Sequence, residues 1–541
     1  MLKTEGRWVL SEGRFKELLN PVAYLHAPEE VELRQTHISY LFLTPDFVYK
    51  VKKPVNFGFL DFTTLEKRRH YCAEEVRLNS RLAPDVYLGV VEIKEDGGRL
   101  IVEGKSGNTV EYAVKMRRLA AENILEEKIR QGTASVEDIQ RVASAIAHFH
   151  RGAESGAHIS EYGRPEMIEK NINENFVQTK SFAGRFISPA SYDAMQSFAL
   201  GFMKNKRASL LKRVKDGFIR DCHGDIHSEH ISIDGSIDII DCIEFNERFR
   251  YSDTISDMAF LSMDLDFHNR CDFSAAFEKS YLEASGDASG KELILFYKSY
   301  RAYVRGKVEG LKAAEDEVGK AERQAARLKA ARYFDLAEAY TQGAPRPRLI
   351  IICGLSGTGK STLARALGKA LWAESLATDR IRRELRSPTN ADSPTQYGEG
   401  PYSIEERTRT YRELFRRACA DYLQKGRTVI LDATFSKNSL LTEAVSSARK
   451  AGLEPEDITI FECLLEMGLL KERIGKRQRE GGAEDLPLSE MRVDIFKAHL
   501  DEYEKKEGDI VPLNTASPPR ENLQAMIKVI LKKGKDREPG G

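Results

Sequence analysis

Two different rhythms of hydrophobic and polar residues divide the chain. Up to about residue 120, short strand-like segments flank turn residues, as LFLT and DFVYKVKK do on either side of Pro45-Asp46. These segments predict a small, largely antiparallel sheet, and the pattern at residues 66–83 inserts one helix into it. From about residue 121 the pattern is mostly helical, and residues 291–340 predict one long amphipathic helix.

The carboxyl-terminal part alternates strands, loops and helices instead. RLIIICG, TVILDAT and DITIFECLL are nearly continuous apolar strands, and a helix is expected to begin at Lys360. Such strands between helices are typical of an α/β domain with a parallel sheet covered by helices. Residues 341–348, TQGAPRPR, contain two prolines and a glycine and predict a linker. The expected domains are therefore residues 1–340 and residues 349–535.

The composition narrows the classes of function. Of the 541 residues, 41% are hydrophobic and 31% charged, which is typical of a globular protein with ample core material. Lysine plus arginine equals aspartate plus glutamate, 83 against 83, so no overall charge attracts nucleic acid. The sequence has no apolar run of membrane-spanning length and no signal-peptide core. Seven cysteines without a Cys-x-x-Cys pair favour free thiols, and we expect a cytoplasmic protein.

The most specific chemical motif is GLSGTGKST, residues 354–362. Its glycines, lysine and serine have the spacing of a Walker A phosphate-binding loop, between a predicted strand and a predicted helix. In such a loop, backbone N–H groups and the positive end of the following helix face the phosphates. Lys360 is expected to contact the outer phosphates, and the hydroxyl of Ser361 to ligate magnesium. The expected nucleotide contacts are Gly354, Ser356, Gly357, Thr358, Gly359, Lys360, Ser361 and Thr362.

Three further segments suggest what happens to the bound phosphate. Asp379, in LATDRIRREL, is predicted at a strand end, either as a base for a hydroxyl proton or as a helix N-cap. Asp432 ends a buried strand, where it suits a contact to magnesium-bound water or to substrate. Arg473 and Arg477 share a helix face and are candidates to close over the phosphate, although a solvated basic helix gives the same pattern.

These features resemble the P-loop kinases related to polynucleotide kinase, zeta toxin and gluconate kinase, over about residues 346–510. The resemblance rests on GLSGTGKST, on TDRIR and on the DAT that follows a strand. It implies ATP, magnesium and phosphorylation of a hydroxyl, but it does not fix the acceptor. A nucleic-acid 5′ end stays an alternative acceptor, supported only by the arginines of RIRREL and RTRTYRELFRR.

A second candidate site surrounds DCHGDIHSEH, residues 221–230. His-x-Asp at 223–225 resembles the start of a catalytic loop of the protein-kinase type, which would make Asp225 the base. Upstream, Lys50 lies on a predicted strand and Glu75 on the following helix, the pair that positions phosphates in kinase folds. Downstream, Asp241 stands where a kinase holds its metal ion. His230 occupies the place of the second metal ligand, normally asparagine, and no glycine-rich loop is present.

The order of these residues resembles the aminoglycoside phosphotransferase and choline kinase group, over about residues 25–310. The resemblance implies a bilobal α+β kinase domain with a small lobe at about residues 25–120 and a helical lobe at residues 121–340. It also implies ATP, magnesium, a small hydroxylated substrate, and a role for Asp257 in holding the catalytic loop.

Taken whole, the chain resembles bacterial proteins that fuse such a domain to a P-loop kinase. The resemblance predicts a bifunctional phosphotransferase that acts on small molecules. No membrane partner is expected. Because His230 replaces asparagine and the glycine loop is missing, a second interpretation stays open. The first domain would then bind a ligand without chemistry and regulate the second domain.

Overall fold

The computed structural model describes residues 2–4, 7–9, 12–58, 60–315, 318–385, 403–479 and 500–533, with side chains from residue 13 and without those of 477–479. The chain divides into two compact units. The first comprises Met1–Lys180, Asp193–Asp264 and Ala275–Arg301, and the second comprises Ser181–Tyr192, Leu265–Ser274 and Ala302–Gly541. The predicted linker does not separate these units, because the helix before it packs within the second unit. Separate folding of the two expected domains stays a prediction.

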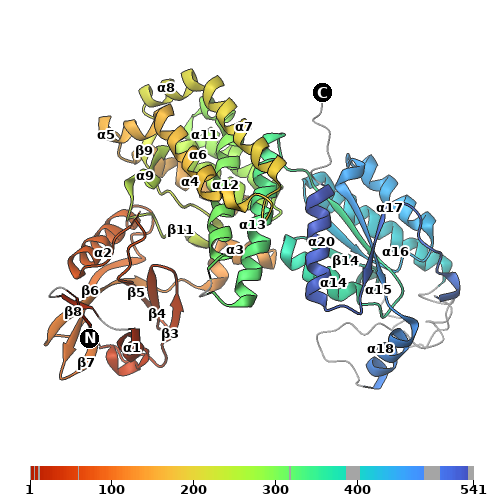
Figure 1. Ribbon diagram of the computed structural model, residues 1–541, viewed down its shortest axis with the longest axis horizontal. Helices are drawn as coiled ribbons and strands as arrows, with labels where there is room; N and C mark the ends of the chain where they lie inside the picture. The colour runs from red at the N-terminus through yellow and green to blue at the C-terminus, as the bar shows by residue number, and fades with distance from the viewer. Residues whose placement is uncertain are drawn as a thin grey trace. The chain divides into compact units, whose positions relative to one another are not determined.

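The first unit contains a six-stranded antiparallel sheet, drawn in red and orange in Figure 1. Its strand order is β3 (Glu32–Gln35), β4 (Ser39–Leu43), β5 (Phe47–Lys52), β8 (Asn108–Arg117), β6 (Tyr87–Asp96) and β7 (Arg99–Val102). Helix α2 (Leu65–Asn79) packs on β6 and β8. The side chain of Thr64 caps this helix by accepting a hydrogen bond from the Lys67 N–H. The predicted antiparallel sheet with one inserted helix is therefore confirmed.

The rest of the first part of the chain is mostly helical, as expected. Its helices are α3 (Leu125–Gln131), α4 (Val136–Gly152), α5 (Ala157–Ser160), α6 (Pro165–Thr179), α7 (Pro189–Asn205), α8 (Arg207–Lys215), α9 (Glu247–Arg250), α10 (Thr254–Phe267), α11 (Cys271–Ser285) and α12 (Ile294–Lys312). Three short antiparallel pairs accompany these elements, namely β1 (Leu2–Thr4) with β2 (Arg7–Val9), β9 (Ile219–Asp221) with β12 (Tyr251–Asp253), and β10 (Ile231–Asp234) with β11 (Ser236–Ile239). The last of these pairs is a hairpin that turns at Gly235, between Asp234 and Ser236.

The prediction of one long helix over residues 291–340 is wrong. Helix α12 ends at Lys312 and α13 (Lys320–Thr341) begins after Gly319, whose ψ of 146° is extended and not helical. The apolar pattern continues across this break, so periodicity alone gave no sign of it.

The second unit is built on a five-stranded parallel sheet. Its order is β14 (Glu374–Ala377), β15 (Val429–Asp432), β13 (Leu349–Cys353), β16 (Ile458–Leu464) and β17 (Ile510–Asn514). The helices are α14 (Lys360–Leu371), α15 (Thr378–Leu385), α16 (Ile404–Arg417), α17 (Asn438–Lys450), α18 (Met467–Arg479) and α20 (Pro519–Lys533).

Side chains of β13 alternate between two cores in this unit. Ile350 and Ile352 pack with residues of α14 and α20, whereas Ile351 and Cys353 pack with residues of α16 and α17. The helices accordingly cover the sheet on both faces (Figure 1). The predicted α/β domain with a covered parallel sheet is confirmed.

Segments that precede the predicted linker also pack on this sheet. The Asn269 side chain donates to the carbonyls of Trp372 (3.2 Å) and Thr428 (2.9 Å), and it accepts from the Thr428 N–H (2.7 Å). In α13, Arg332 donates to the carbonyls of Ala370 and Phe267, each at 2.6 Å. Residues far upstream of its sheet therefore contribute hydrogen bonds to the second unit.

Within the part of the chain that the structure describes, no helix has both the length and the apolar character needed to cross a membrane.

Candidate active sites

The phosphate-binding loop of the second unit connects β13 to α14. All residues of β13 are buried, and the loop turns back over the end of the sheet through three glycines with positive φ, at positions 354, 357 and 359. At Gly354, φ is 133° and a Cβ atom would lie 2.5 Å from the carbonyl oxygen of Cys463. Only glycine fits both that backbone conformation and that distance. The loop therefore passes close to β16, with its backbone exposed toward the start of α14.

Lys360, Ser361 and Asp432 meet at the carboxyl end of this sheet. Lys360 is largely buried and donates to the Leu355 carbonyl at 3.0 Å, so its ammonium lies back over the loop. Asp432 ends β15, and its register partner on the adjacent strand is Ile352. Burial raises the pKa of the Asp432 carboxyl, while the charge of Lys360 and a hydrogen bond with Ser361 act in the opposite direction. A carboxylate and a hydroxyl beside the loop are oxygen ligands of the kind that magnesium prefers.

Asp379 lies one strand further along the same edge. It stands in the first turn of α15, whose strand β14 pairs Ala377 with Asp432. Because the helix begins at Thr378, Asp379 is not its N-cap, and that alternative is wrong. Its carboxylate is 57% exposed and accepts a hydrogen bond from Arg382 at 2.8 Å. The pairing of β14 with β15 therefore brings both carboxylates to the same edge of the sheet.

A cavity of about 280 Å³ opens beside the loop. Arg473, on α18, lines this cavity, and its guanidinium donates a hydrogen bond to the backbone carbonyl of Thr515 at 3.0 Å. The side chain of Arg477 lies outside the described residues, so the predicted arginine pair is placed only in part. The remaining lining residues are Gly357, Thr358, Gly359, Thr362, Leu363, Lys476, Ser517, Pro519 and Asn522. Sequence reasoning missed the loop after β17, which has no motif of its own and is brought here by the fold.

In the first unit, Lys50 joins residues that are far apart in the chain. Its Nζ lies 2.7 Å from Glu75 Oε1, on α2, and 2.5 Å from Asp241 Oδ1, beyond β11. Lys52, two residues along β5, pairs with Glu75 Oε2 at 2.7 Å and with Glu244. Sequence reasoning missed Glu244, three residues after Asp241.

In this buried network the lysines and carboxylates stabilise one another's charged forms. Burial would lower the pKa of Lys50, but Asp241 and Glu75 raise it well above its ordinary value. Burial would raise the pKa of the Glu75 carboxyl, but Lys50 and Lys52 hold it below its ordinary value. For Asp241 too, the charge of Lys50 outweighs burial and lowers the pKa. The lysines and these two carboxylates are therefore charged at neutral pH, which is what a phosphate- and metal-binding site requires.

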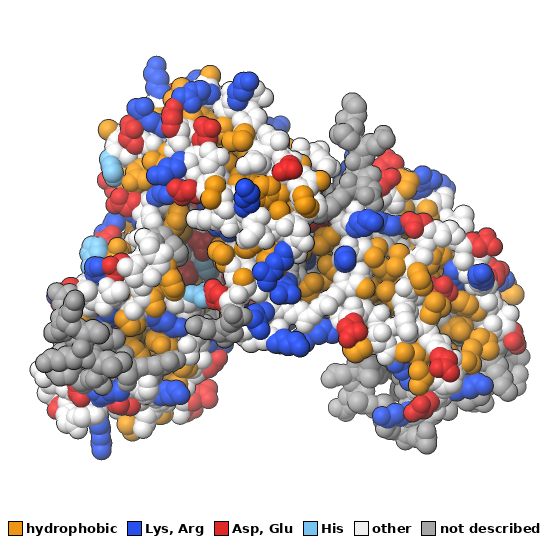
Figure 2. Space-filling view, viewed as in Figure 1, with side chains coloured by type: hydrophobic (Ala, Val, Ile, Leu, Met, Phe, Trp, Pro, Cys, Tyr) orange, Lys and Arg blue, Asp and Glu red, His pale blue; other side chains and the backbone are white. Residues whose placement is uncertain are grey.

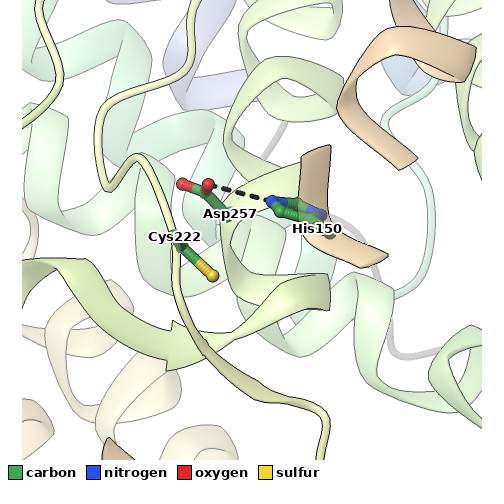
Figure 3. A group of neighbouring side chains, drawn as sticks. All are labelled: His150, Cys222 and Asp257. Carbon is green, nitrogen blue, oxygen red and sulfur yellow. Dashed lines mark hydrogen bonds and ion pairs between the residues drawn. The ribbon is translucent and has the colours of Figure 1, made fainter. Parts of the chain in front are cut away.

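Asp257, on α10, holds the loop that begins at Cys222 (Figure 3). Its carboxylate accepts from the backbone N–H groups of His223 (2.9 Å) and Gly224 (2.8 Å), and it lies 3.1 Å from His150 Nε2. Asp257 is fully buried, and the Cys222 thiol stands beside it. Burial raises the pKa of that thiol well above its ordinary value, so it is not a thiolate. We interpret this cluster as an anchor for the loop and not as a metal site.

Beyond this anchor, Asp225 lies with two histidines. Asp225 Oδ2 is 3.6 Å from His227 Nε2 and 3.7 Å from His230 Nδ1, and His230 Nε2 is 3.5 Å from Asp241 Oδ2. On the face shown in Figure 2, acidic and histidine side chains gather in a hollow of the first unit. The structure thus brings Lys50, Glu75, Asp225, His230 and Asp241 together around one region, as their order in the sequence predicted.

Two curated proteins match most of the chain. They are the uncharacterized protein Rv2004c of Mycobacterium tuberculosis (strain ATCC 25618 / H37Rv) and the uncharacterized protein Mb2027c of Mycobacterium bovis. Each is 32% identical over 457 residues, which are 84% of this chain and 87% of the relative. The chain belongs to the family of these mycobacterial proteins. The match extends over most of the length of each protein and is longer than either unit of this chain, so it includes parts of both units.

Within this family member, residues 349–502 match the protein family described as AAA domain. The expected P-loop domain in the carboxyl-terminal part is thereby confirmed. Among solved structures, the chain is similar to a choline/ethanolamine kinase family protein from Mesorhizobium loti, with 13% identity and a TM-score of 0.37, over 60% of this chain and 98% of that chain. It is also similar to a gluconokinase from Sinorhizobium meliloti, with 18% identity and a TM-score of 0.26, over 35% of this chain and 95% of that chain. At these TM-scores neither similarity bears on activity.

Proposed function

We propose that the protein is an ATP-dependent phosphotransferase with two modules, each of which moves the γ-phosphoryl group to a hydroxyl of a small molecule. One observation carries the proposal. In each unit a buried lysine suited to phosphate stands beside a carboxylate at the position expected for a metal ligand. Lys360 and Asp432 are that pair in the second unit, and Lys50 and Asp241 are that pair in the first.

In the second unit, the loop backbone and the start of α14 hold the phosphates, and Lys360 leaves the Leu355 carbonyl to contact their outer oxygens. Ser361 and Asp432 are the residues that would hold Mg²⁺, which supplies charge neutralisation on the phosphates. Asp379 is assigned as the base, because it is exposed at the same edge of the sheet. Arg473 closes the cavity beside the loop, which we assign to the nucleotide.

In the first unit, Glu75 orients Lys50 toward the α- and β-phosphates, and Asp241 is the expected metal ligand. Asp225 takes the hydroxyl proton of the acceptor, on a loop that Asp257 fixes. Lys52 and Glu244 are assigned a positioning role, since both are buried and Lys52 shares Glu75 with Lys50. A small polar acceptor in the cytoplasm suits the zero net charge of the chain.

The test uses the full chain with point variants, because the second unit includes segments from residues 181–192 and 265–274 and a simple truncation would divide it. ATP turnover and phosphorylated products are measured against a library of small hydroxylated metabolites. Lys360→Ala should remove one set of products and Asp225→Ala another, and the double variant should be inactive. Lys369→Ala and Asp234→Ala, which change exposed residues of α14 and of the β10–β11 hairpin, serve as matched controls.

The outcomes separate the alternatives. If Asp225→Ala removes no product, and the Lys360→Ala protein still binds ATP without turnover, the first module is a regulator. If an oligonucleotide 5′ end is phosphorylated and no metabolite is, the nucleic-acid alternative replaces the small-molecule acceptor. A wild-type protein that turns over no ATP with any acceptor, and binds none, contradicts the whole proposal.

A further inference from the structure

Two imidazoles and two carboxylates converge in the first unit, where the resemblance to kinases predicts a magnesium site. The side chains are those of Asp225, His227, His230 and Asp241. Ligand atoms of the first three all lie within 4.8 Å of one another. Asp241 joins them through Oδ2, which is 3.5 Å from His230 Nε2, while its other oxygen pairs with Lys50. Such a set is unusual for magnesium, which binds oxygen ligands almost exclusively.

The tautomer of His230 prepares it to bind a metal ion. His230 Nδ1 lies 3.0 Å from the backbone carbonyl of Asp225. A carbonyl can only accept a hydrogen bond, so Nδ1 must carry the proton. The neutral ring then has its lone pair on Nε2, the atom that faces Asp241. Ligating histidines in metal sites are oriented in this way, with one ring nitrogen donating to a backbone carbonyl.

The surrounding residues hold both rings in place. His227 is 3% exposed, and its ring centroid lies 3.8 Å from that of His230, at an interplanar angle of 38°. The ring of Phe260 packs beside His227 at 5.9 Å. The short turn that carries His230 is anchored by Asp264, which accepts hydrogen bonds from the N–H (2.8 Å) and hydroxyl (2.6 Å) of Ser228. The ligand groups therefore need little ordering when an ion binds.

The spacing of the ligand atoms suits a small ion. With metal–ligand bonds of about 2.1 Å, the ligands of a tetrahedral zinc site lie about 3.4 Å apart. Two separations here join ligand atoms, 3.6 Å between Asp225 Oδ2 and His227 Nε2 and 3.5 Å between His230 Nε2 and Asp241 Oδ2, and both lie within a few tenths of an ångström of that value. Mixed imidazole and carboxylate ligands suit zinc and its neighbours in the first transition series.

We propose that Asp225, His227, His230 and Asp241 form a binding site for a divalent transition-metal ion such as Zn²⁺ or Co²⁺, which they select over Mg²⁺. This inference deepens the proposed function, because one of the four ligands, Asp225, is the proposed base of the first module. The binding itself does not depend on that function. His230, which stands where kinases have an asparagine that binds magnesium, would then bind a transition-metal ion instead.

The experiment titrates Co²⁺ into the full-length, chelator-treated protein without nucleotide and in excess Mg²⁺, and follows visible absorption. Tightly bound Co²⁺ should give the ligand-field bands of nitrogen and oxygen coordination, and Zn²⁺ should displace it while Mg²⁺ does not. His227→Ala and His230→Ala should each weaken Co²⁺ binding at least about 100-fold, since even outer-shell changes cost about 10–100-fold. His158→Ala, which removes a 71% exposed ring, should bind as the wild type does.

His230→Asn separates the loss of a nitrogen ligand from misfolding. Asparagine supplies the oxygen ligand found in kinases, and the metal-free variant should unfold at the same temperature as the metal-free wild type. It should weaken Co²⁺ binding and strengthen Mg²⁺ binding. The proposal is overturned if the histidine variants bind Co²⁺ like the wild type, or if the spectrum shows the intense near-ultraviolet band of thiolate ligands. The titration contains no ATP, so its result is independent of the activity assay. Co²⁺ binding together with an absence of phosphoryl transfer in that assay would contradict only the proposed function.

Discussion

Replacing Asp257 by asparagine should release the loop that carries Asp225. The carboxylate accepts three hydrogen bonds, two of them from consecutive backbone N–H groups, and it is fully buried. Asparagine has the same shape but only one acceptor oxygen, so its NH₂ group must face at least one of these donors. A buried backbone N–H is then left without a partner.

Two estimates of the cost agree. Burial would raise the pKa of Asp257, but the hydrogen bond with His150 and nearby positive charge lower it from 3.8 to about 2. A shift of that size corresponds to about 2 kcal/mol of stability at neutral pH. An unpaired buried donor costs about 1–3 kcal/mol. We expect Asp257→Asn to destabilise the loop by about 2 kcal/mol, with the activity of the first module lost.

The same shift fixes the pH dependence. A carboxyl whose pKa is depressed by folding stabilises the protein above its ordinary pKa. This contribution should be complete above about pH 4 and should be lost as the pH falls toward about 2.

Hydrogen exchange of the peptide that contains residues 221–226 measures this effect locally. A loss of about 2 kcal/mol should speed exchange there by about 30-fold, since 1.4 kcal/mol is tenfold. Asp216→Asn is the control, because its exposed carboxylate forms a surface ion pair with Lys212, and such pairs contribute about 0–1 kcal/mol. If the Asp257→Asn peptide keeps wild-type protection, Asp257 does not hold the loop.

Three further predictions concern the second unit. Lys360→Ala should lower ATP turnover by this unit at least about 100-fold in steady-state kinetics, since electrostatic stabilisation dominates at such sites, and wild-type turnover would contradict its assignment. Gly354→Ala should destabilise the unit by at least about 2 kcal/mol in thermal unfolding, because the new Cβ would lie 2.5 Å from the Cys463 carbonyl, whereas Gly452→Ala has open space and only backbone strain. Asn269→Ala should cost about 2–4 kcal/mol by the same measurement, because its three hydrogen bonds to the backbone of Trp372 and Thr428 are lost; an unchanged melting temperature would show that this contact is dispensable.

The phosphate-binding loop could be predicted from the sequence because its chemistry is local. The glycines, Lys360 and Ser361 lie within nine residues, and the strand and helix that frame them have clear apolar patterns. Asp432 and Asp379 were also predictable in outline, since residues that end parallel strands meet at one edge of a sheet.

The first site was predictable only as an ordered set of residues, because its members are separated by up to about 190 positions. Their order suggested Lys50, Glu75, Asp225 and Asp241, but no local pattern marked Glu244 as the second partner of Lys52. The pairing exists because the strand β5 and the segment after β11 are brought together by the tertiary fold.

The tertiary structure also decided two points that the sequence left open. His227 and His230 are three residues apart, and only the fold shows that they face Asp225 and Asp241 together and that a backbone carbonyl fixes the His230 tautomer. Likewise, the prolines near residue 345 predicted a division, yet Arg332 of α13 binds the Ala370 carbonyl of α14 and Asn269 binds the Thr428 carbonyl just before β15. The sequence determined which local segments form and which chemistry they carry. Contacts between distant segments decided what surrounds each group, because packing and hydrogen bonding act through space and not along the chain.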